Sequence, residues 1–261
     1  MAPRRRQSGR SRLAMEMAVR GVVLLTAGTD TLALTTEWAM ALLLKHPEVI
    51  RKAGAEIDAN VGMGRLVEES DITNLPYLQY VVKETLRLSP VGPIIPAHEA
   101  MEDCTVGGFH VQCGTMILLN GWAIHRDINI WDAPEEFRPE RFLERDMATT
   151  PMLPFGLGRR RCPAEGLAMR LVSLTVAAPM QSFEWDVGEG DTIDMAECSG
   201  LTMPMATPLA TVCRPGSFSR ACSLYRVLCI SVCKIKTDEN YPRKRQQNLQ
   251  SNFAKTVRIT T

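Results

Sequence analysis

The feature that most constrains this chain is a glycine- and arginine-rich loop that leads into a single cysteine and then a helix. It spans residues 154–166 and reads PFGLGRRRCPAEG. Gly156 and Gly158 allow a tight backbone path where a larger side chain would obstruct a bulky flat ligand. Pro163 suits the first position of a helix, which would place Cys162 at the helix N-cap. There the helix dipole and the neighbouring arginines would favour the thiolate form of the cysteine.

A cysteine thiolate in this setting has three candidate roles. It could be a nucleophile, but the sequence has no local Cys/His signature that would supply a base. It could be a structural cysteine beside a basic loop, which is the commoner role of a lone cysteine. It could be a soft metal ligand, and ligation of a haem iron by one thiolate agrees best with the glycines, Phe155 and Arg160. We therefore predict that Cys162 is a haem ligand.

Charge is distributed unevenly along the 261 residues, although the net charge is only +1. Residues 1–12 hold five arginines and no acidic residue, whereas residues 216–261 hold nine Lys or Arg against two acidic residues. Residues 13–215 therefore carry a net charge of −11. Because 45% of the chain is hydrophobic, we expect one globular domain at 13–215 between two basic, disordered segments.

The cysteines, histidines and apolar runs exclude several classes of protein. The eight cysteines include no Cys-x2-Cys pair, and the four histidines lack zinc spacing. A disulfide framework is typical of small secreted chains, so we expect reduced cysteines. No apolar run reaches the ~20 residues that span a bilayer, and the Arg-rich start lacks the apolar part of a secretory signal. The chain as written is therefore expected to be cytosolic.

A long apolar stretch at residues 13–44 predicts a helix that is buried, because its apolar residues are not confined to one face. The pattern is broken at residues 27–31, where a glycine, two threonines and an aspartate occur. Glycine lowers helix stability by roughly 1 kcal/mol, and threonine hydroxyls can bend a helix by bonding to the preceding turn. The break could mark a close helix–helix contact. It could instead open a groove over a ligand, with Asp30 and Thr31 available for proton transfer.

The rest of the pattern is that of a helix-rich domain with a small separate sheet. Further helices are predicted at 47–59, 76–88 and 164–178, with a helical turn at 122–126. Short strands are predicted at 104–106, 109–111, 116–120, 183–187 and 201–205. Pro179 would end the last helix early or destabilise it by ~3 kcal/mol. The fold class is therefore mainly α with a small segregated β portion.

Two charged motifs complete the pattern. Glu84 and Arg87 are three residues apart on the helix at 76–88, so they share a face and can pair. This spacing also occurs by chance, and an exposed pair would contribute little to stability. A Pro-Glu-Arg-Phe run follows at 139–142 and contains Arg141.

Taken in order along the chain, these motifs resemble the cytochrome P450 family of haem-thiolate monooxygenases. Residues 27–31 are similar to the oxygen-activation motif of the family's long I helix, and residues 84–87 to the Glu-x-x-Arg of its K helix. Residues 139–142 match its Pro-Glu-Arg-Phe run, and residues 155–162 match the haem-binding loop that precedes the L helix. Stretches such as residues 122–127 are similar to plant microsomal members, closest to those that hydroxylate isoflavones and related phenolics. The resemblance covers residues 13–215, the C-terminal half of such an enzyme.

The resemblance implies a role for each motif. Cys162 would be the axial thiolate ligand of haem b, and Arg160 and His98 would bind its propionates. Thr31 and Asp30 would organise the waters that protonate bound dioxygen. The other implied cofactor-binding residues are Phe155, Gly156, Gly158 and Ala164, and the implied buried ion cluster behind the haem is Glu84, Arg87 and Arg141.

The implied activity is insertion of one oxygen atom of O2 into an apolar or phenolic small molecule of plant secondary metabolism. Electrons would come from NADPH through a flavoprotein reductase, with Arg159 and Arg161 as candidate docking residues, and no nucleic-acid partner is expected. Full-length members lie on the cytosolic face of the endoplasmic reticulum, held by an N-terminal anchor that we do not expect within this sequence. The alternative is a non-catalytic fragment that binds haem weakly or not at all.

Overall fold

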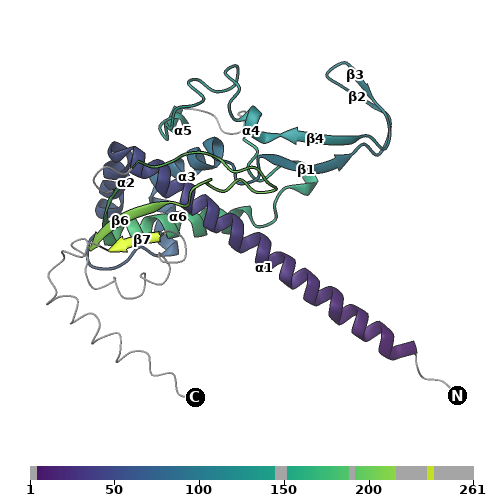
Figure 1. Cartoon of the computed structure of the whole chain (residues 1–261), viewed down its shortest axis with the longest axis horizontal. Helices are drawn as coiled ribbons and strands as arrows, with labels where there is room; N and C mark the ends of the chain where they lie inside the picture. The colour runs from purple at the N-terminus through teal and green to yellow at the C-terminus, as the bar shows by residue number, and fades with distance from the viewer. Residues whose placement is uncertain (1–4, 145–151, 188–191, 216–233, 238–261) are drawn as a thin grey trace.

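The structure, a computed structural model, describes residues 5–144, 152–187, 192–215 and 234–237. Figure 1 shows a body of packed helices from which two features project, the N-terminal part of helix α1 and a long β-hairpin. The helices and turns are α1 (Arg5–Lys45), α2 (Pro47–Asn60), α3 (Pro76–Leu88), α4 (Gly121–Ile124), α5 (Arg141–Glu144) and α6 (Glu165–Ser182), with 3-10 turns at Glu69–Asn74 and Gly158–Arg160.

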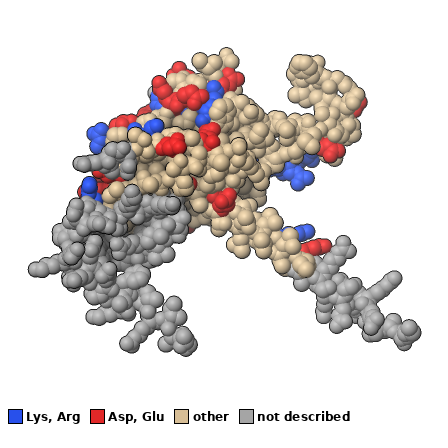
Figure 2. Space-filling model, viewed as in Figure 1, with Lys and Arg blue, Asp and Glu red and all other residues tan. Residues whose placement is uncertain are grey.

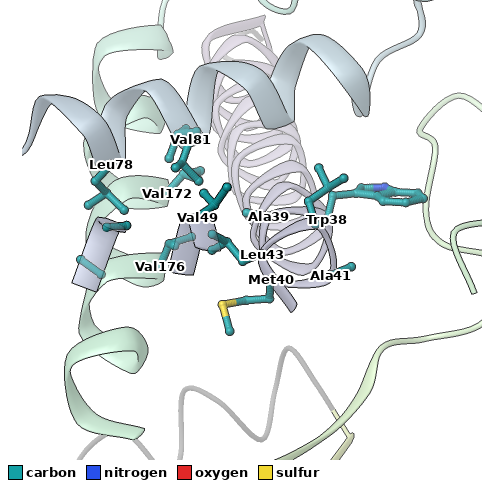
Figure 3. Close-up of a cluster of buried hydrophobic side chains, with 14 of the residues drawn as sticks. Trp38, Ala39, Met40, Ala41, Leu43, Val49, Leu78, Val81, Val172 and Val176 are labelled. Atoms are coloured by element: carbon teal, nitrogen blue, oxygen red, sulfur yellow. The ribbon is translucent and has the colours of Figure 1, made fainter. Parts of the chain in front are cut away.

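The core forms where the C-terminal part of α1 meets α2, α3 and α6. Figure 3 shows Leu43 of α1 and Val81 of α3 pointing into the same cluster, with Val172 and Val176 entering from α6. Pro47 and Pro76 occupy the first positions of their helices, where a missing backbone N–H leaves no bond unmade. Each of these helices buries an apolar stripe, and that burial is what holds the body together.

The strands form small separate sheets. β1 (Ile94–Glu99) pairs antiparallel with β4 (Met116–Asn120), and the tip of this projecting hairpin carries the β2–β3 pair (Cys104–Val106 and Phe109–Val111). Gly107 and Gly108 make the turn between β2 and β3 with φ of 56° and 88°, which glycine adopts without strain. β6 (Ala210–Pro215) pairs antiparallel with β5 (Phe183–Asp186) and parallel with β7 (Lys234–Thr237).

Most element predictions agree with the structure in place and type. The helix at 76–88, the hairpin strands at 104–106 and 109–111 and the strand at 116–120 have the predicted bounds. The strand at 201–205 is wrong, because within it only Met205 forms a bridge, to Glu197. The last helix does not stop at Pro179 but continues to Ser182, where the Pro179 carbonyl accepts a hydrogen bond from Trp185 Nε1 at 3.0 Å.

Helix α1 departs from its prediction at the N-terminal side. It begins at Arg5, not near residue 13, and its residues from Met15 to Thr31 are largely exposed rather than buried. Val22 and Leu24 are 62% and 71% exposed, and Figure 2 shows this part of the helix as an almost uncharged projection. Its apolar pattern is real, but no described segment packs against it.

The expectation that no stretch could span a bilayer also needs correction. Residues 15–45 of α1 are long and apolar enough to cross a membrane by length and composition alone. The apolar 18-residue window that meets this criterion is 0% buried among the described residues, whereas residues 38–44 at the C-terminal end of α1 are buried in the core.

The terminal segments are described only in part. Residues 1–4, 216–233 and 238–261 lie outside the described residues, so the predicted disorder of the two ends stays a prediction. Residues 145–151, in the linker before the cysteine loop, also lie outside them.

Candidate functional site

Most predicted site residues line one groove of about 1620 Å³. Its walls come from α1, strand β1, the loop at 153–164 and the start of α6. The predicted site residues that line it are Thr31, His98, Phe155, Gly156, Arg160, Cys162 and Ala164. Asp30 and Gly158 are not among the lining residues, and the side chain of Asp30 is exposed next to the groove.

The α1 wall of the groove is open at the predicted break in the pattern. Gly28 lines the groove, and a Cβ atom placed on it would meet no atom within 4 Å. Thr31 Oγ1 donates to the Ala27 carbonyl at 2.8 Å, as a threonine does within a helix. The helix nevertheless remains continuous through these residues. Among the described residues, Gly28 lines the groove and makes no close helix–helix contact, which agrees with the second of the two interpretations of this break.

The cysteine loop is held in shape by its own backbone. Gly156 and Gly158 have φ of 70° and 65°, the left-handed conformation that favours glycine. The Cys162 N–H donates to the Phe155 carbonyl at 2.8 Å, which closes the loop, and the Gly156 N–H donates to the Leu153 carbonyl at 3.1 Å. Cys162 is half-buried at the groove wall.

The predicted helix N-cap is wrong. The helix α6 begins at Glu165 with Ala164 as its N-cap, so Pro163 and Cys162 precede the helix as a turn. The dipole effect falls off within one helical turn and acts more weakly on Cys162 than predicted. Arg161 forms an ion pair with Glu165, which neutralises one of the three loop arginines.

The three predicted members of the ion cluster meet in the interior. Arg87 Nε and Nη2 donate to the two carboxylate oxygens of Glu84 at 2.8 and 2.9 Å, and Arg141 Nε donates to the same carboxylate at 2.8 Å. All three side chains are buried, so the low-dielectric surroundings strengthen each bond. Burial lowers the pKa of Arg141, and Glu84 acts in the opposite direction.

Backbone carbonyls accept hydrogen bonds from further guanidinium donors of this cluster. They gather the turns between α4 and α5 around the two arginines, so the cluster organises a segment that has almost no regular structure of its own. The carbonyls belong to His125, Pro134 and Glu136 for Arg87, and to Asp132, Ala133 and Glu136 for Arg141.

The two candidate propionate-binding residues approach the groove from different elements. His98 lies on β1, and its Nδ1 is 2.8 Å from the Pro96 carbonyl. A carbonyl can only accept, so Nδ1 carries a proton and Nε2 is the atom left for a ligand. Arg160 ends the 3-10 turn Gly158–Arg160 and is exposed at the groove rim.

One buried residue of this region was missed in the sequence. His125 is fully buried, and its Nε2 accepts a hydrogen bond from the Leu153 N–H at 2.8 Å. Burial, with the positive charges of Arg87 and Arg126, lowers the pKa of His125 to about 4, so the ring is neutral at neutral pH. Its place in the short turn at 122–126 gave no signal that a buried acceptor was needed.

The donor set of the groove determines what kind of metal group it can hold. Within the described parts of the chain, no group of three or more His, Cys, Asp or Glu side chains could hold a metal ion. Cys162 alone cannot bind a bare ion firmly. A porphyrin brings four nitrogen ligands of its own and needs only an axial one, so the single thiolate fits haem.

The comparisons with known proteins decide the family. The cytochrome P450 family model matches residues 6–213, most of the chain. The chain belongs to the cytochrome P450 family. Among curated plant relatives, cytochrome P450 81Q32 of Catharanthus roseus is 51% identical over 203 residues, or 77% of this chain and 40% of the relative. Isoflavone 3'-hydroxylase of Medicago truncatula is 46% identical over 198 residues, or 75% of this chain and 39% of the relative.

Solved cytochrome P450 structures show the same fold. A zebra fish cytochrome P450 with abiraterone is 36% identical with a TM-score of 0.70, covering 75% of this chain and 46% of that one. The zebra fish cytochrome P450 with progesterone is 37% identical with a TM-score of 0.67, covering 74% and 44%. The chain thus spans about two-fifths of the length of its curated relatives. Membership of the family implies a haem cofactor.

Proposed function

We propose that this cytochrome P450 chain forms the haem-binding side of a haem-thiolate monooxygenase. The observation that carries the proposal is that Cys162 and Thr31 line the same groove although they are far apart in the sequence. In this assignment α1 corresponds to the family's I helix, α3 to the K helix and α6 to the L helix.

In the proposed site, Cys162 holds the haem iron through its thiolate. The bound haem supplies the iron centre at which dioxygen is activated. Arg160 and His98 bind the two propionates, Arg160 as a fixed cation and His98 through Nε2. The side chains and backbone that form the remaining contact surface are Phe155, Gly156 and Ala164, while Gly158 shapes the loop.

Thr31 and Asp30 handle protons in this proposal. The Thr31 hydroxyl donates to the Ala27 carbonyl, so its lone pairs accept a hydrogen bond from water in the groove. Asp30 is exposed beside it and exchanges protons with bulk solvent. Together they relay a proton from solvent to a water that Thr31 orients at the groove wall.

The groove favours an apolar substrate. Leu24, Ala27 and Ile95 contribute apolar surface to the groove near Thr31. The relatives include an isoflavone 3'-hydroxylase and, in Glycyrrhiza echinata, an isoflavone 2'-hydroxylase. We therefore propose an apolar or phenolic plant metabolite as the substrate class.

The proposed electron source is NADPH through a flavoprotein reductase. Arg159 is the better docking residue on the cysteine loop, because Glu165 neutralises Arg161. The proposed location of the whole enzyme is the cytosolic face of the endoplasmic reticulum membrane, where such a reductase is found.

A second candidate is a non-catalytic protein that binds haem weakly. The exposed apolar residues of α1 favour it, since Val22, Leu24 and Leu25 are 62%, 71% and 69% exposed. An active site needs a supporting shell on every side, and no described residue covers this one.

The absorbance difference spectrum of the reduced chain with and without carbon monoxide distinguishes the two. A strongly red-shifted band that Cys162→Ser removes and Cys104→Ser preserves would support the thiolate site. Cys104, on β2 of the projecting hairpin, also lines the groove, so this control asks whether any thiol of the groove or only Cys162 supplies the thiolate. A spectrum typical of histidine-bound haem, or equal effects of both substitutions, would favour the second candidate.

A further inference from the structure

His125 is shared between the ion cluster and the cysteine loop. Its backbone carbonyl accepts a hydrogen bond from Arg87 Nη1 at 2.8 Å, and its ring Nε2 accepts one from the Leu153 N–H at 2.8 Å. The residue follows α4 directly, and its backbone N–H donates to the Gly121 carbonyl at 3.0 Å. His125 is thus held through its backbone, and its imidazole presents one acceptor, Nε2, to the loop.

The Leu153 backbone connects His125 to the cysteine loop. Its carbonyl accepts from the Gly156 N–H at 3.1 Å, and the next bond along, from the Cys162 N–H to the Phe155 carbonyl, is 2.8 Å long. Leu153 is itself buried and lines the groove. A displacement of the Leu153 backbone would therefore alter the loop that sets the position of the Cys162 sulfur.

The ring of His125 supplies an acceptor that the buried Leu153 N–H needs. Because Nε2 accepts, the neutral ring carries its proton on Nδ1, and Nδ1 is buried with no hydrogen-bond partner in the described parts of the chain. A buried donor without a partner is unfavourable. An apolar side chain would remove that defect but would leave the buried Leu153 N–H without an acceptor.

We propose that His125 is a positioning residue for the haem loop, which it couples to the buried Glu84–Arg87 pair through the Leu153 backbone. The role rests on the proposed function of Cys162 as a thiolate ligand. Among the polar contacts that the structure describes, His125 makes none with Cys162. Leu153 is the one groove-lining residue to which it bonds.

The test compares two substitutions in the full 261-residue chain. His125→Gln keeps an acceptor near the position of Nε2, whereas His125→Phe keeps a flat ring without an acceptor. Ile57→Ala is the matched control, because Ile57 is equally buried but lies on α2, which contributes no residue to the groove.

Hydrogen–deuterium exchange of the haem-free chain is the first measurement. We expect His125→Phe to speed exchange in residues 152–162 by about tenfold to a hundredfold, the effect of one buried donor left without an acceptor. His125→Gln should stay within about threefold of the unsubstituted chain, and Ile57→Ala should raise exchange without singling out the loop. Equal exchange in the Phe and Gln variants would overturn the proposal.

The rate of haem loss to a competing apoprotein is the second measurement. We expect His125→Phe to lose haem about tenfold faster than His125→Gln, with a weaker thiolate band, because the loop no longer fixes Cys162. Unchanged haem loss and an unchanged thiolate band in His125→Phe would overturn the positioning role while the proposed function stands. No thiolate band in any variant, with the exchange pattern as expected, would overturn the proposed function instead.

Acidification provides a third measurement that needs no destabilised variant. Protonation of Nε2 removes the acceptor, and the charged groups on the elements around it are Glu84 and Arg87 on α3, Arg126 after α4 and Arg141 on α5. After correction for the intrinsic pH dependence of exchange, residues 152–162 should exchange faster toward pH 4 in the unsubstituted chain but not in His125→Gln. The same acid response in both chains would overturn the proposal.

Discussion

Glu84 and Arg141 are 57 residues apart in the sequence, yet Arg141 Nε lies 2.8 Å from Glu84 Oε1 in a fully buried contact. The Arg138 backbone N–H donates to the same oxygen at 2.9 Å, so one carboxylate fixes both the side chain and the backbone of the segment before α5. The structure therefore depends on Glu84 more than an isolated Glu-x-x-Arg motif would suggest.

Glu84→Gln should destabilise the chain by about 3–5 kcal/mol, because it leaves the buried cations Arg87 and Arg141 without their counter-charge. Urea unfolding followed by circular dichroism measures the change. The control is Glu69→Gln, which breaks an exposed ion pair with Arg170 and should cost no more than about 1 kcal/mol. Similar losses of unfolding free energy in both variants would show that the buried cluster contributes no more to stability than an exposed ion pair.

The stability of the chain should fall as pH drops below about 6.5 because of His125. Its pKa is about 4 when folded, against 6.5 as the ordinary value, so the unfolded chain binds the proton more readily. This contribution to stability is complete above pH 6.5 and is lost progressively toward pH 4, reaching about 3 kcal/mol. Denaturant unfolding at several pH values should show a flatter profile for His125→Gln than for the unsubstituted chain, and equally steep profiles would contradict this assignment.

Thr31→Ala should leave the fold intact and impair only the chemistry. Among the described residues, the Thr31 hydroxyl bonds only to its own helix. Alanine is the better helix former, so the free energy of unfolding should change by less than about 0.5 kcal/mol. In an enzyme completed by the segment that its relatives carry, the substitution should raise the NADPH consumed per product formed, whereas Thr31→Ser should not. Unchanged coupling in Thr31→Ala would remove this hydroxyl from the proposed proton path.

The exposed part of α1 should make the chain self-associate. Val22, Leu24 and Leu25 are exposed apolar side chains on this part of the helix, and exposed apolar surface drives association in water. Replacing Leu24 and Leu25 with glutamine should shift the chain to smaller species in size-exclusion chromatography with light scattering. Replacing the buried Leu42 and Leu43 with glutamine should unfold the chain instead. Identical elution of the unsubstituted chain and the surface variant would contradict this expectation.

Local signals in the sequence were sufficient for elements whose bounds are set by neighbouring residues. Pro76 and Ser89-Pro90 bound one helix, and Gly107-Gly108 placed the hairpin turn, because these residues restrict the backbone irrespective of distant contacts. Strand β6 was not predicted, because its partners are β5 and β7 and a strand with distant partners has little local signature.

The predictions for the site divide in the same way, into features set by local sequence and features set by distant contacts. The order of the motifs indicated most of the residues that line the groove, though not their roles, and the positive φ of Gly156 and Gly158 agrees with the tight backbone path predicted there. The start of α6 was misplaced, because Pro163 fits a turn as well as a first helical position. His125 was missed, because its importance comes from one backbone amide 28 residues away, and sequence patterns do not report such a bond.

The members of the ion cluster are far apart in the sequence, and this separation affects the order in which parts of the chain fold. The carboxylate of Glu84 cannot meet Arg141 until the hairpin of β1 and β4 and the turns after it have been brought back to α3. Closing such a loop is entropically unfavourable before any contact compensates for it. The cluster should therefore form after the folding transition state, when α1, α3 and α6 have already packed. Substitutions in the ion cluster would mainly accelerate unfolding and leave the folding rate nearly unchanged. A substituted chain would therefore fold about as fast as the unsubstituted chain but stay folded for a shorter time.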